Sequence, residues 1–572
     1  MSQSSTGRPA GVFKAADERY TAMMAALHYH DAMPASDLSA AAHSIVAVEL
    51  IVGLEVHVEL ATISKMFSRA PSPAYAMAGE HTPNTLVDAT VFALPGALPV
   101  MNHAAVEMSI RVGLSLNCEI ARVCRWDRKS YFYPDLPKGY QLSQHEQPLC
   151  GEGHMDLPPA DGQGFPTVGA EGSRIRILRA HLEEDAGKLL HEAPGGRAIA
   201  HSLVDENRAG TPLLEIVTQP DFRSSAQVVL FCRMLHDLCR GLGVTHGLLE
   251  RGHMRFEPNI NCRLTLADGR TIATPIVEIK NLNSFRSVMA AIDHELAEQP
   301  RRWQQDGREM GPGTKTTRGW DDVRAVTFVQ REKEDAHDYR YFPDPDLPPV
   351  HVDEAWIERL RATLNSTPQS RWARYTGDYG LAPREASSIM SEEIDARLLD
   401  EAAAAAVSLG VAPPRAGKLV AGFILGPIRK AENDPQNWRG NYGTYEGPPP
   451  IPAVFLGAIA ALREEAKIAS AGVEPLIAKA WTLDTTTDPH AARALLESLA
   501  KKLGVLVTRD DDAIAAMNAW IAEVLTQNEK IVGEIRAGKQ QAIGRLIGEV
   551  MKRAGGGADA RSVREALIAA IG

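Results

Sequence analysis

The sequence has few cysteines and no long apolar run. Six cysteines stand in 572 residues and none forms a CxxC pair, which argues against a disulfide scaffold and a compact zinc finger. Because free thiols suit a reducing compartment, we expect a cytoplasmic protein. No stretch approaches the roughly 20 apolar residues that cross a bilayer, and the N-terminus lacks the pattern of a secretion signal, so we expect no membrane association.

Common nucleotide and hydrolase motifs are also missing. The sequence contains no GxxxxGK[ST] loop, no GxGxxG after a strand, no HExxH and no GxSxG. These absences argue against a P-loop site, a Rossmann site, a zincin and a serine hydrolase of the α/β type. A bound nucleotide must therefore be held by a metal ion and by the walls of a cradle.

The overall charge is acidic, because 61 Lys and Arg face 72 Asp and Glu, which gives −11. General adhesion to nucleic acid is excluded, and any polyanion must meet a local basic surface. Such a surface occurs near the C-terminus, where only Glu549 and Asp559 oppose seven cations: Arg536, Lys539, Arg545, Lys552, Arg553, Arg561 and Arg564. This pattern fits phosphate-backbone binding, and an ordinary solvated helix face is the alternative.

The pattern of elements changes along the chain and predicts an α+β protein. Residues 1–49 are an Ala/Ser-rich extension. In residues 50–352, apolar and polar residues alternate over short segments, which predicts strands of a mixed or antiparallel sheet. Residues 353–488 and 489–572 carry helical spacing and are predicted as an all-α domain and an all-α tail domain.

Two helices are predicted within the sheet domain, and two Ala/Leu-rich segments dominate the helical part. Serine N-caps at Ser224 or Ser225 and at Ser284 predict helices that run to about Gly241 and towards Arg302. Helical spacing also covers residues 392–409 and 453–471, and residues 447–452 and 482–488 are predicted as a loop and a linker.

Acidic side chains recur on the polar faces of the predicted strands. In the segment 53–60, Glu55, His57 and Glu59 alternate with apolar residues, so they share one face at about 6.5–7 Å intervals. Residues 255–266 and 275–280 repeat the pattern with Glu257 and Glu278. A solvated strand face is the ordinary explanation for each of these residues taken alone.

Glu215 is harder to explain as a solvated residue, because four apolar residues surround it in Leu-Leu-Glu-Ile-Val, and a carboxylate there needs a partner. The run Glu183-Glu184-Asp185 follows a predicted strand over residues 174–180 and adds charge at the end of that strand. If one sheet collects Glu55, His57, Glu184, Glu215, Glu257 and Glu278, a cation must intervene, and Mg²⁺ suits such oxygen ligands.

Two loop-rich segments combine aromatic residues, cations and prolines. In residues 127–140, Lys129, Lys138 and Tyr140 can present donors to an anion or to a polar conduit. In residues 336–346, Arg340 lies between two tyrosines and can stack or pair. Surface loops with buried aromatic residues are the alternative for both segments.

The ordered motifs resemble the B subunit of the tRNA-dependent aspartyl/glutamyl amidotransferases. The motifs include Gly-Leu-Glu-Val-His-Val-Glu-Leu at 53–60, His-Leu-Glu-Glu-Asp-Ala-Gly-Lys at 181–188 and Glu-Ile-Lys-Asn-Leu-Asn-Ser at 278–284. The resemblance extends from about Val52 to the C-terminus and leaves the first 49 residues outside it.

The resemblance implies a catalytic cradle, a helical domain and a tail that binds tRNA. It also implies a heterotrimer with an amidase, the A subunit, which releases ammonia, and with a small C subunit. The B subunit of this family uses ATP and Mg²⁺ to phosphorylate the side-chain carboxylate of misacylated Glu-tRNA(Gln) or Asp-tRNA(Asn), and ammonia then displaces the phosphate.

The resemblance also implies roles for individual residues. By motif position, Glu55, His57, Glu184, Glu215, Glu257 and Glu278 look catalytic, with His57, Glu184 and Glu215 as metal ligands. Lys129 and Lys138 look like part of the ammonia route. The tail residues expected to bind tRNA are Lys539, Arg545, Lys552 and Arg553.

Two departures from the family pattern and two rival interpretations accompany this prediction. Cysteine pairs that hold zinc in many members are missing after Phe67 and after Asn84, so no structural zinc is predicted. The usual Asp-Ala-Asn reads Glu257-Pro-Asn here, which makes Glu257 the least secure site residue. The rivals are a non-catalytic tRNA-docking scaffold and a two-metal nuclease built on the same acids.

Overall fold

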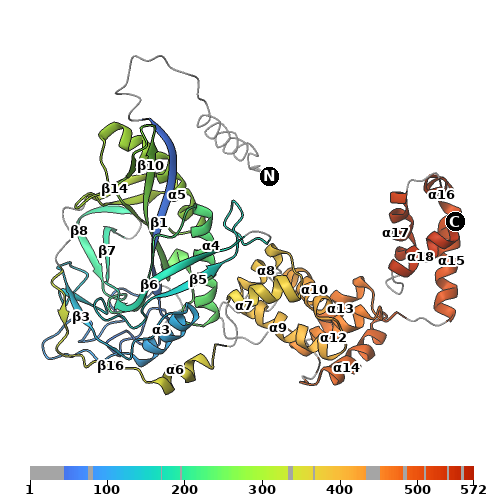
Figure 1. The fold of residues 1–572 in the computed structure, drawn as a ribbon. Coiled ribbons are helices and arrows are strands. Elements are labelled where there is room, and N and C mark those ends of the chain that lie inside the picture. Colours follow the sequence, from blue (N-terminus) through green and yellow to red (C-terminus); the bar gives the residue numbers. More distant parts are fainter. Residues whose placement is uncertain are drawn as a thin grey trace, which may run out of the picture.

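The computed structural model describes residues 44–74, 81–168, 171–193, 196–332, 339–364, 368–432, 451–480, 483, 486–507, 511–536, 540–554 and 560–571. Most of the predicted N-terminal extension, most of the 447–452 loop and Lys539 lie outside these ranges. The remaining chain combines one large mixed sheet with a helical C-terminal half (Figure 1). The predicted α+β class is confirmed.

A twelve-stranded sheet dominates the first half. Its order is β14-β13-β12-β10-β1-β9-β6-β4-β3-β15, with β11 beside β10 and β5 beside β6. All its pairs are antiparallel except the parallel β12–β13 pair. The strands are β1 (Ile45–Glu59), β3 (Asp127–Ser130), β4 (Tyr140–Ser143), β5 (Gly153–Leu157), β6 (Ser173–Glu184), β9 (Pro212–Thr218), β10 (Met254–Leu266), β11 (Thr271–Ala273), β12 (Val277–Lys280), β13 (Thr316–Asp321), β14 (Val326–Glu332) and β15 (Phe342–Pro343).

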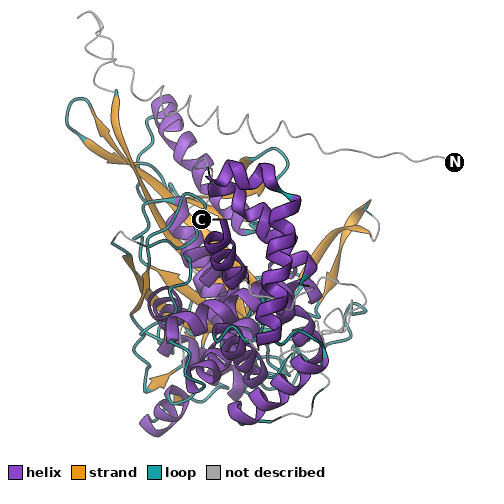
Figure 2. Cartoon of the chain, turned by 90° about the vertical axis from the view of Figure 1, so that its right-hand side faces the viewer, coloured by secondary structure: helices purple, strands orange, loops and turns teal. Residues whose placement is uncertain are grey.

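Two small antiparallel pairs accompany this sheet in the described chain. Strand β2 (Val123–Cys124) pairs with β16 (Val350–His351). Strands β7 (Lys188–Ala193) and β8 (Arg197–Asp205) form a hairpin that stands away from the helices (Figure 2). A short 3₁₀ turn, Leu249–Arg251, precedes β10.

Alternation along the strands separates a core face from a polar face. On β1, Val52, Leu54, Val56 and Val58 are fully buried or nearly so. They share one hydrophobic core with helices α3 (His103–Ser115), α4 (Ser225–Gly241) and α5 (Phe285–Asp306). The opposite parity, which carries Glu55 and His57, is left for the functional face.

Serine caps explain where the two predicted helices begin. The side chain of Ser224 accepts a hydrogen bond from Gln227 N at 3.2 Å, and that of Ser284 accepts one from Ser287 N at 3.0 Å. Both helices are confirmed. Helix α5 runs four residues beyond the expected end and stops at Gly307, whose φ of 65° requires the left-handed region that glycine tolerates.

The core of the sheet domain extends beyond the boundary predicted at residue 352. Helix α6 (Glu354–Arg361) buries Ile357 and Leu360 in the sheet's core. The ring of Trp356 stacks on His103 with centroids 4.7 Å apart, and its Nε1 donates to Glu107 at 2.8 Å. These contacts to α3 place α6 with the sheet, and we move the boundary to the interval between α6 and α7.

A second core is purely helical and includes a segment predicted for the tail. Leu496 and its neighbours in α14 pack into it, so the boundary predicted at 488/489 falls within one core. Helix α9 lies where spacing predicted a helix, and the 453–471 segment is divided between α12 and α13. The elements are α7 (Pro368–Ala373), a π-helical turn (Arg374–Asp378), α8 (Pro383–Met390), α9 (Glu393–Ser408), α10 (Pro413–Phe423), a second π-helical turn (Ile424–Ile428), α11 (Arg429–Glu432), α12 (Ala453–Glu464), α13 (Ser470–Ala480) and α14 (Pro489–Lys502).

The last helices form a small third core, which lies at the far end of the chain in Figure 1. Its buried residues include Val524, Leu546 and Leu567. The elements are α15 (Asp511–Gln527), α16 (Glu529–Arg536), a 3₁₀ turn (Gln540–Ala542), α17 (Ile543–Arg553) and α18 (Ala560–Ile571). None of the helices in the described ranges has the length and apolar character that a bilayer crossing requires.

Candidate functional site

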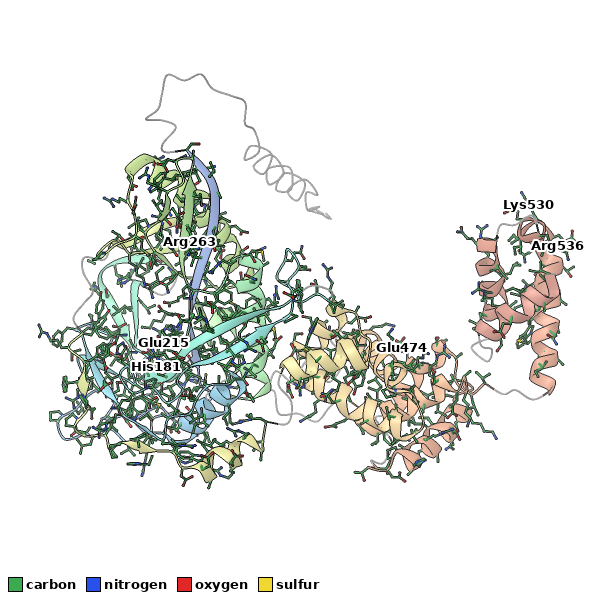
Figure 3. All side chains as sticks on the ribbon, in the orientation of Figure 1. His181, Glu215, Arg263, Glu474, Lys530 and Arg536 are labelled. Atoms are coloured by element: carbon green, nitrogen blue, oxygen red, sulfur yellow. The ribbon has the colours of Figure 1, made fainter. Side chains whose placement is uncertain are left out.

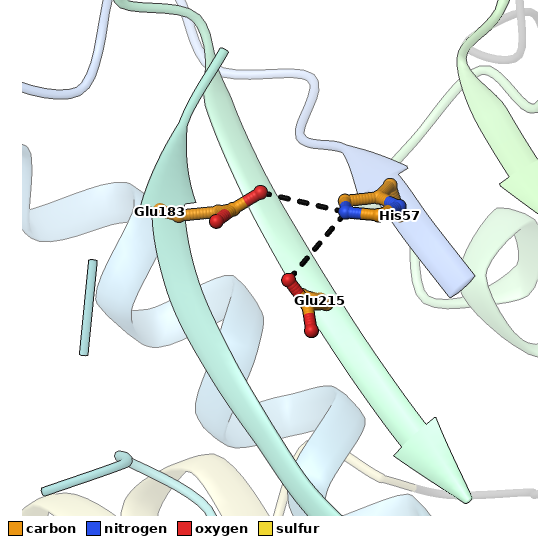
Figure 4. A group of neighbouring side chains, drawn as sticks. All are labelled: His57, Glu183 and Glu215. Carbon is orange, nitrogen blue, oxygen red and sulfur yellow. Dashed lines mark ion pairs between the residues drawn. The ribbon is translucent and has the colours of Figure 1, made fainter. Parts of the chain in front are cut away.

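Three adjacent strands bring two histidines and two glutamates together on the polar face. In the strand register, His57 on β1 lies opposite Glu215 on β9, which lies opposite His181 on β6. The Nε2 atom of His57 is 3.5 Å from Glu183 Oε1 and 3.5 Å from Glu215 Oε2 (Figure 4). The side chains of His181 and Glu215 lie together at the lower part of the sheet in Figure 3.

The donor atoms of His57, Glu183 and Glu215 fit a small divalent cation. One atom from each residue lies within 4.8 Å of the others, and no other such group of three occurs among the described side chains. One or two carboxylates are the usual protein contribution to an Mg²⁺ site, with water or phosphate oxygens as the remaining ligands. The Nδ1 atom of His57 is buried and has no hydrogen-bond partner, which leaves Nε2 directed at the carboxylates.

Burial and mutual repulsion set the protonation of this cluster. Burial alone favours a neutral His57, but Glu215 and Glu183 overcome it and raise the pKa of His57 to about 9. Burial, together with the charge of Glu215, raises the pKa of Glu183 to about 7. Burial opposes ionisation of Glu215 as well, yet the imidazoles of His181 and His57 hold its pKa well below the ordinary range. A metal ion bound here would have to displace the proton of His57, so its affinity should rise with pH.

His181 is a buried neutral neighbour of this cluster. Burial lowers its pKa to about 4. The guanidinium of Arg179 donates from Nε to His181 Nδ1 at 3.4 Å. Because Nδ1 accepts, the ring proton resides on Nε2, which lies 3.7 Å from Glu215 Oε2. His181 therefore presents a donor towards the carboxylate that His57 also contacts.

Glu184, which was predicted as a metal ligand, is not at this cluster. Successive residues of a strand face opposite sides, so β6 directs Glu183 to His57 and Glu184 away from it. Glu184 is ion-paired with Lys138, and its Oε1 accepts from Leu142 N at 2.9 Å. The metal set that the structure supports is therefore His57, Glu183 and Glu215.

The carboxylates predicted farther along the sheet are mostly neutralised by lysines. The Nζ atom of Lys280 lies 2.6 Å from Glu257 and 3.1 Å from Glu278. Lys315 adds a second cation at 2.9 Å from Glu278. Glu55 differs, because its Oε1 accepts a hydrogen bond from Asn259 Nδ2 at 3.0 Å; burial, followed by the charge of Glu215, raises its pKa.

An arginine borders the cluster on the side of β10. Arg255 lies opposite His57 in the β1–β10 register and is ion-paired with the buried Asp185. Arg208 approaches the same carboxylate at 3.3 Å. Burial, followed by the charge of Asp185, raises the pKa of the nearby Glu59 to about 7. This corner of the face supplies two guanidinium groups beside the candidate metal ligands.

The two lysines predicted for an ammonia route lie in different surroundings. Burial opposes the charge of Lys129, but Glu183 and Tyr341 raise its pKa, and its Nζ lies 5.2 Å from the Tyr339 ring centroid. Lys129 therefore interacts electrostatically with the candidate metal ligands Glu183 and Glu215. Lys138 lines a narrow pocket with Lys65, Phe67, Leu136, Glu184 and Asp185.

The tail cations predicted to bind tRNA also differ from one another. Arg545 and Lys552 are exposed on α17. Arg553 instead donates to Gln527 Oε1 at 2.6 Å and pairs with Glu549 at 3.2 Å. Lys539 lies outside the described residues.

Sequence reasoning missed Glu183, His181 and the Arg255–Asp185 pair. The strand before Glu183 was expected to end at residue 180, whereas β6 continues to Glu184. If the alternation had been extended by four residues, it would have placed His181 and Glu183 on one face. The pairing of Arg255 with Asp185 had no local signal, because 70 residues separate the two.

Comparison with known proteins identifies relatives of nearly the whole chain. Family models described as the GatB/GatE catalytic domain and the GatB domain match residues 50–358 and 404–571. A protein of Rhodopirellula baltica, named as the B subunit of aspartyl/glutamyl-tRNA(Asn/Gln) amidotransferase, is 38% identical over 91% of this chain and 96% of its own length. The protein of the same name from Variovorax paradoxus is 38% identical over 92% of this chain and 99% of its own length.

Proposed function

The chain belongs to the GatB family of amidotransferase B subunits, and on this premise we propose that it activates the side-chain carboxylate of a tRNA-bound glutamate or aspartate with ATP. The substrates are misacylated Glu-tRNA(Gln), Asp-tRNA(Asn) or both. The products are the corresponding amides on tRNA, with ammonia supplied by a separate amidase subunit.

The observation that carries this proposal is the cluster of His57, Glu183 and Glu215. When bound, Mg²⁺ would supply positive charge that offsets the negative charge developing during phosphoryl transfer. His57 Nε2, Glu183 and Glu215 would hold the ion, since their atoms converge within 4.8 Å. Lys129 and Arg255 flank the cluster as permanent cations, which favours the approach of a polyphosphate to an otherwise acidic surface.

The proposed reaction has two steps. The substrate carboxylate attacks the γ-phosphorus of ATP, the bond to the β–γ bridging oxygen breaks, and ADP leaves. Ammonia then attacks the acyl carbon, inorganic phosphate leaves with the bonding electron pair, and a proton passes from nitrogen to a base. Exclusion of water matters, because hydrolysis of the acyl phosphate would waste ATP.

The partner in this proposal is an amidase subunit that docks over an exposed apolar patch. Two loops carry this patch: Phe92, Leu94, Leu98, Val100, Phe132 and Tyr133 are all at least 40% exposed. Both loops border the narrow pocket of Lys138, which leads to Glu184 and Asp185. Such a patch is typical of a protein–protein interface, and the pocket beneath it suits the entry of ammonia.

The decisive measurement is ADP formation by the reconstituted complex with and without misacylated tRNA. We expect ADP only when Mg²⁺ and misacylated tRNA are both present, and Glu215→Gln to remove ADP and amide formation together. Normal amide formation by Glu215→Gln would contradict the assignment of the cluster. A chain that only docks tRNA would bind it through the tail and show no dependence on Glu215.

A further inference from the structure

Glu55 is the predicted site carboxylate that lacks a cation. Within the described ranges, each of the other four has a basic side-chain nitrogen within 4 Å, and Glu55 has none: the pairs are Lys138–Glu184, His57–Glu215, Lys280–Glu257 and Lys315–Glu278. Lys315 attracts Glu55 over a longer distance, but its own contact at 2.9 Å is with Glu278. A half-buried carboxylate without a counter-ion is costly to keep.

Glu55 lies at one end of a groove on the polar face. The groove is formed by β1, β9 and β10, is open to solvent and has a volume of about 510 Å³. Its floor is Gly53, where an added Cβ would meet only Pro220 at 3.8 Å. Arg263, which also lines the groove, lies well above Glu215 along the sheet in Figure 3.

The strand geometry places Glu55 between this groove and the metal cluster. Glu55 and His57 are two residues apart on the same face of β1, which corresponds to roughly 6.5–7 Å along the strand. The neighbouring Asn259 lies on the same face, lines the groove and fixes one oxygen of Glu55 by its hydrogen bond at 3.0 Å. The other oxygen has no hydrogen-bond partner within the described structure.

The chemistry of this position favours an ammonium ligand over a second metal ion. A second Mg²⁺ or Ca²⁺ would draw on more than one carboxylate, yet lysines already occupy the two nearby ones, Glu257 and Glu278. An ammonium needs only one carboxylate with neutral acceptors beside it, and such charge-assisted bonds are the strong ones. Glu55 and the amide of Asn259 meet this requirement.

We propose that Glu55 binds the α-ammonium group of the amino acid that is esterified to tRNA, with the groove over Gly53 holding the ester-linked end of the nucleic acid. This inference rests on the proposed function and adds the group by which the aminoacyl end is recognised. The α-nitrogen and the side-chain carboxyl carbon of aspartate or glutamate are three or four bonds apart, roughly 3.5–5 Å. An ammonium at Glu55 therefore leaves the reacting carboxylate near His57.

The first test uses the unaltered complex and changes only the substrate. The misacylated tRNA is compared with its α-hydroxy counterpart, in which a hydroxyl replaces the ammonium and leaves size and ester unchanged. Loss of one charge-assisted contact predicts a fall in kcat/KM for amide and ADP formation of about 10- to 100-fold. Equal kcat/KM values for the two substrates would overturn the inference.

The second test asks whether the discrimination resides in Glu55. In Glu55→Gln we expect a lower kcat/KM with the natural substrate. The variant should prefer the natural substrate to the α-hydroxy substrate by no more than about threefold. Its affinity for deacylated tRNA should be unchanged. Glu49→Gln is the matched control. Glu49 lies on the same strand and the same face, and it is already paired with Arg223 at 2.9 Å and Arg263 at 2.7 Å.

The outcomes separate this inference from the proposed function. Glu49→Gln is expected to keep the discrimination of the unaltered complex; if Glu55→Gln also keeps it, Glu55 is not the recognising group. If Glu55→Gln does not assemble, equal kcat/KM values for the two substrates in the unaltered complex would still overturn the inference. Absence of ADP formation from the natural misacylated tRNA would overturn the proposed function itself, whereas ADP formation that is equal for both substrates would overturn only the role of the ammonium.

Discussion

The Nε2 atom of His57 lies 3.5 Å from Oε1 of Glu183. Glu183 is the first of two adjacent glutamates at the end of β6, and the second, Glu184, is paired with Lys138 instead. Because successive residues of a strand face opposite sides, the two neighbouring carboxylates belong to different candidate sites. Glu183 belongs to the candidate metal site, and Glu184 belongs to the pocket that lies beneath the exposed apolar patch.

Replacement of Glu183 by glutamine should weaken Mg²⁺ activation. The amide keeps the shape of the side chain but removes the charge that faces His57. We expect the Mg²⁺ concentration at half-maximal ADP formation to rise by about tenfold or more, a loss typical of damage to a metal site. The measurement is a titration of Mg²⁺ at saturating ATP and misacylated tRNA.

Glu59→Gln is the control for this titration. Glu59 is buried, as Glu183 is, and lies on the same face of β1 as His57, but it is not part of the group of His57, Glu183 and Glu215. Its half-maximal Mg²⁺ concentration should match that of the unaltered protein. If Glu183→Gln also matches it, Glu183 does not contribute to metal binding.

The Lys138–Glu184 pair should govern the use of ammonia from glutamine. Removal of one partner would leave the other charge buried and unpaired, so the informative variant is the double change Lys138→Met with Glu184→Gln. We expect glutamine-dependent amide formation to fall about tenfold, while amide formation with added ammonium salt stays within about twofold. The measurement compares the two nitrogen sources in the reconstituted complex.

Equal losses with glutamine and with ammonium salt would place this pair in the phosphoryl-transfer step instead. The comparison is sharp because ammonium salt bypasses delivery from the amidase but still requires ATP, Mg²⁺ and the cluster at His57.

The apolar patch should determine assembly with the amidase. Phe132 is 88% exposed and Leu98 is 62% exposed, so serine at both positions removes little from the folded core. We expect the double variant to bind the amidase about tenfold more weakly or worse, since exposed aromatic residues commonly dominate interface energies. The measurement is the dissociation constant of the two purified proteins.

Val323→Ser is the matched control, because Val323 is 96% exposed at the turn between β13 and β14, on a different part of the sheet. The control should bind the amidase as the unaltered chain does. Unchanged binding by the Phe132 and Leu98 variant would assign the patch to another partner.

Local patterns in the sequence predicted the polar face well and its pairings poorly. Alternation on β1 placed Glu55 and His57 together because a strand repeats every two residues. The choice between Glu183 and Glu184 required the end of β6, and strand ends depend on pairing with a distant strand, here β9. The lysines at 280 and 315 were missed for a similar reason, since their long side chains reach carboxylates on neighbouring strands.

Boundaries between cores were likewise set by packing that no local pattern reveals. Helix α6 lies after the last strand in sequence, yet Ile357 and Leu360 complete the core of the sheet. Helix α14 follows a linker-like segment, yet Leu496 packs with the second core. In each case the spacing of apolar residues predicted a helix, and only the fold shows which core the helix joins.

Glu206 should make stability depend on pH. It is 5% exposed and its Oε2 has no hydrogen-bond partner, and burial raises its pKa to about 7. A carboxyl whose pKa is raised in the folded state binds more protons there than in the unfolded chain between about pH 4.5 and 7. The free energy of unfolding therefore falls as pH rises through this range. Glu206→Gln should therefore raise the melting temperature at pH 8 by a few degrees and leave it nearly unchanged at pH 4.5.

The check is a pair of thermal unfolding curves for both chains at the two pH values. Glutamine at this position is an uncharged stand-in for the protonated acid, so the difference between the chains should grow with pH. A difference that is equal at pH 4.5 and pH 8, or that shrinks with pH, would show that Glu206 is ionised without cost.

The tail contains exposed cations and cations that hold its helices together, and we expect only the exposed ones to bind tRNA. Arg545 and Lys552 are exposed on α17, whereas Arg553 joins α17 to α15 through Gln527 at 2.6 Å and Glu523 at 3.8 Å. Only the first two of these three are available to meet phosphates. Alanine at Arg545 and Lys552 should therefore weaken tRNA binding without loss of helix content, and alanine at Arg553 should lower the stability of the tail.

The salt dependence of tRNA binding gives the quantitative form of this prediction. Each phosphate contact contributes about 0.7–0.9 to the slope of log K against log salt concentration, so loss of Arg545 and Lys552 together should reduce the slope by about 1.4–1.8. Because affinity from counterion release is largest in dilute salt, the loss of affinity relative to the unaltered complex should be greatest at low salt. An unchanged slope would mean that neither side chain contacts a phosphate, and that the approach of tRNA depends on the cations of the catalytic face instead.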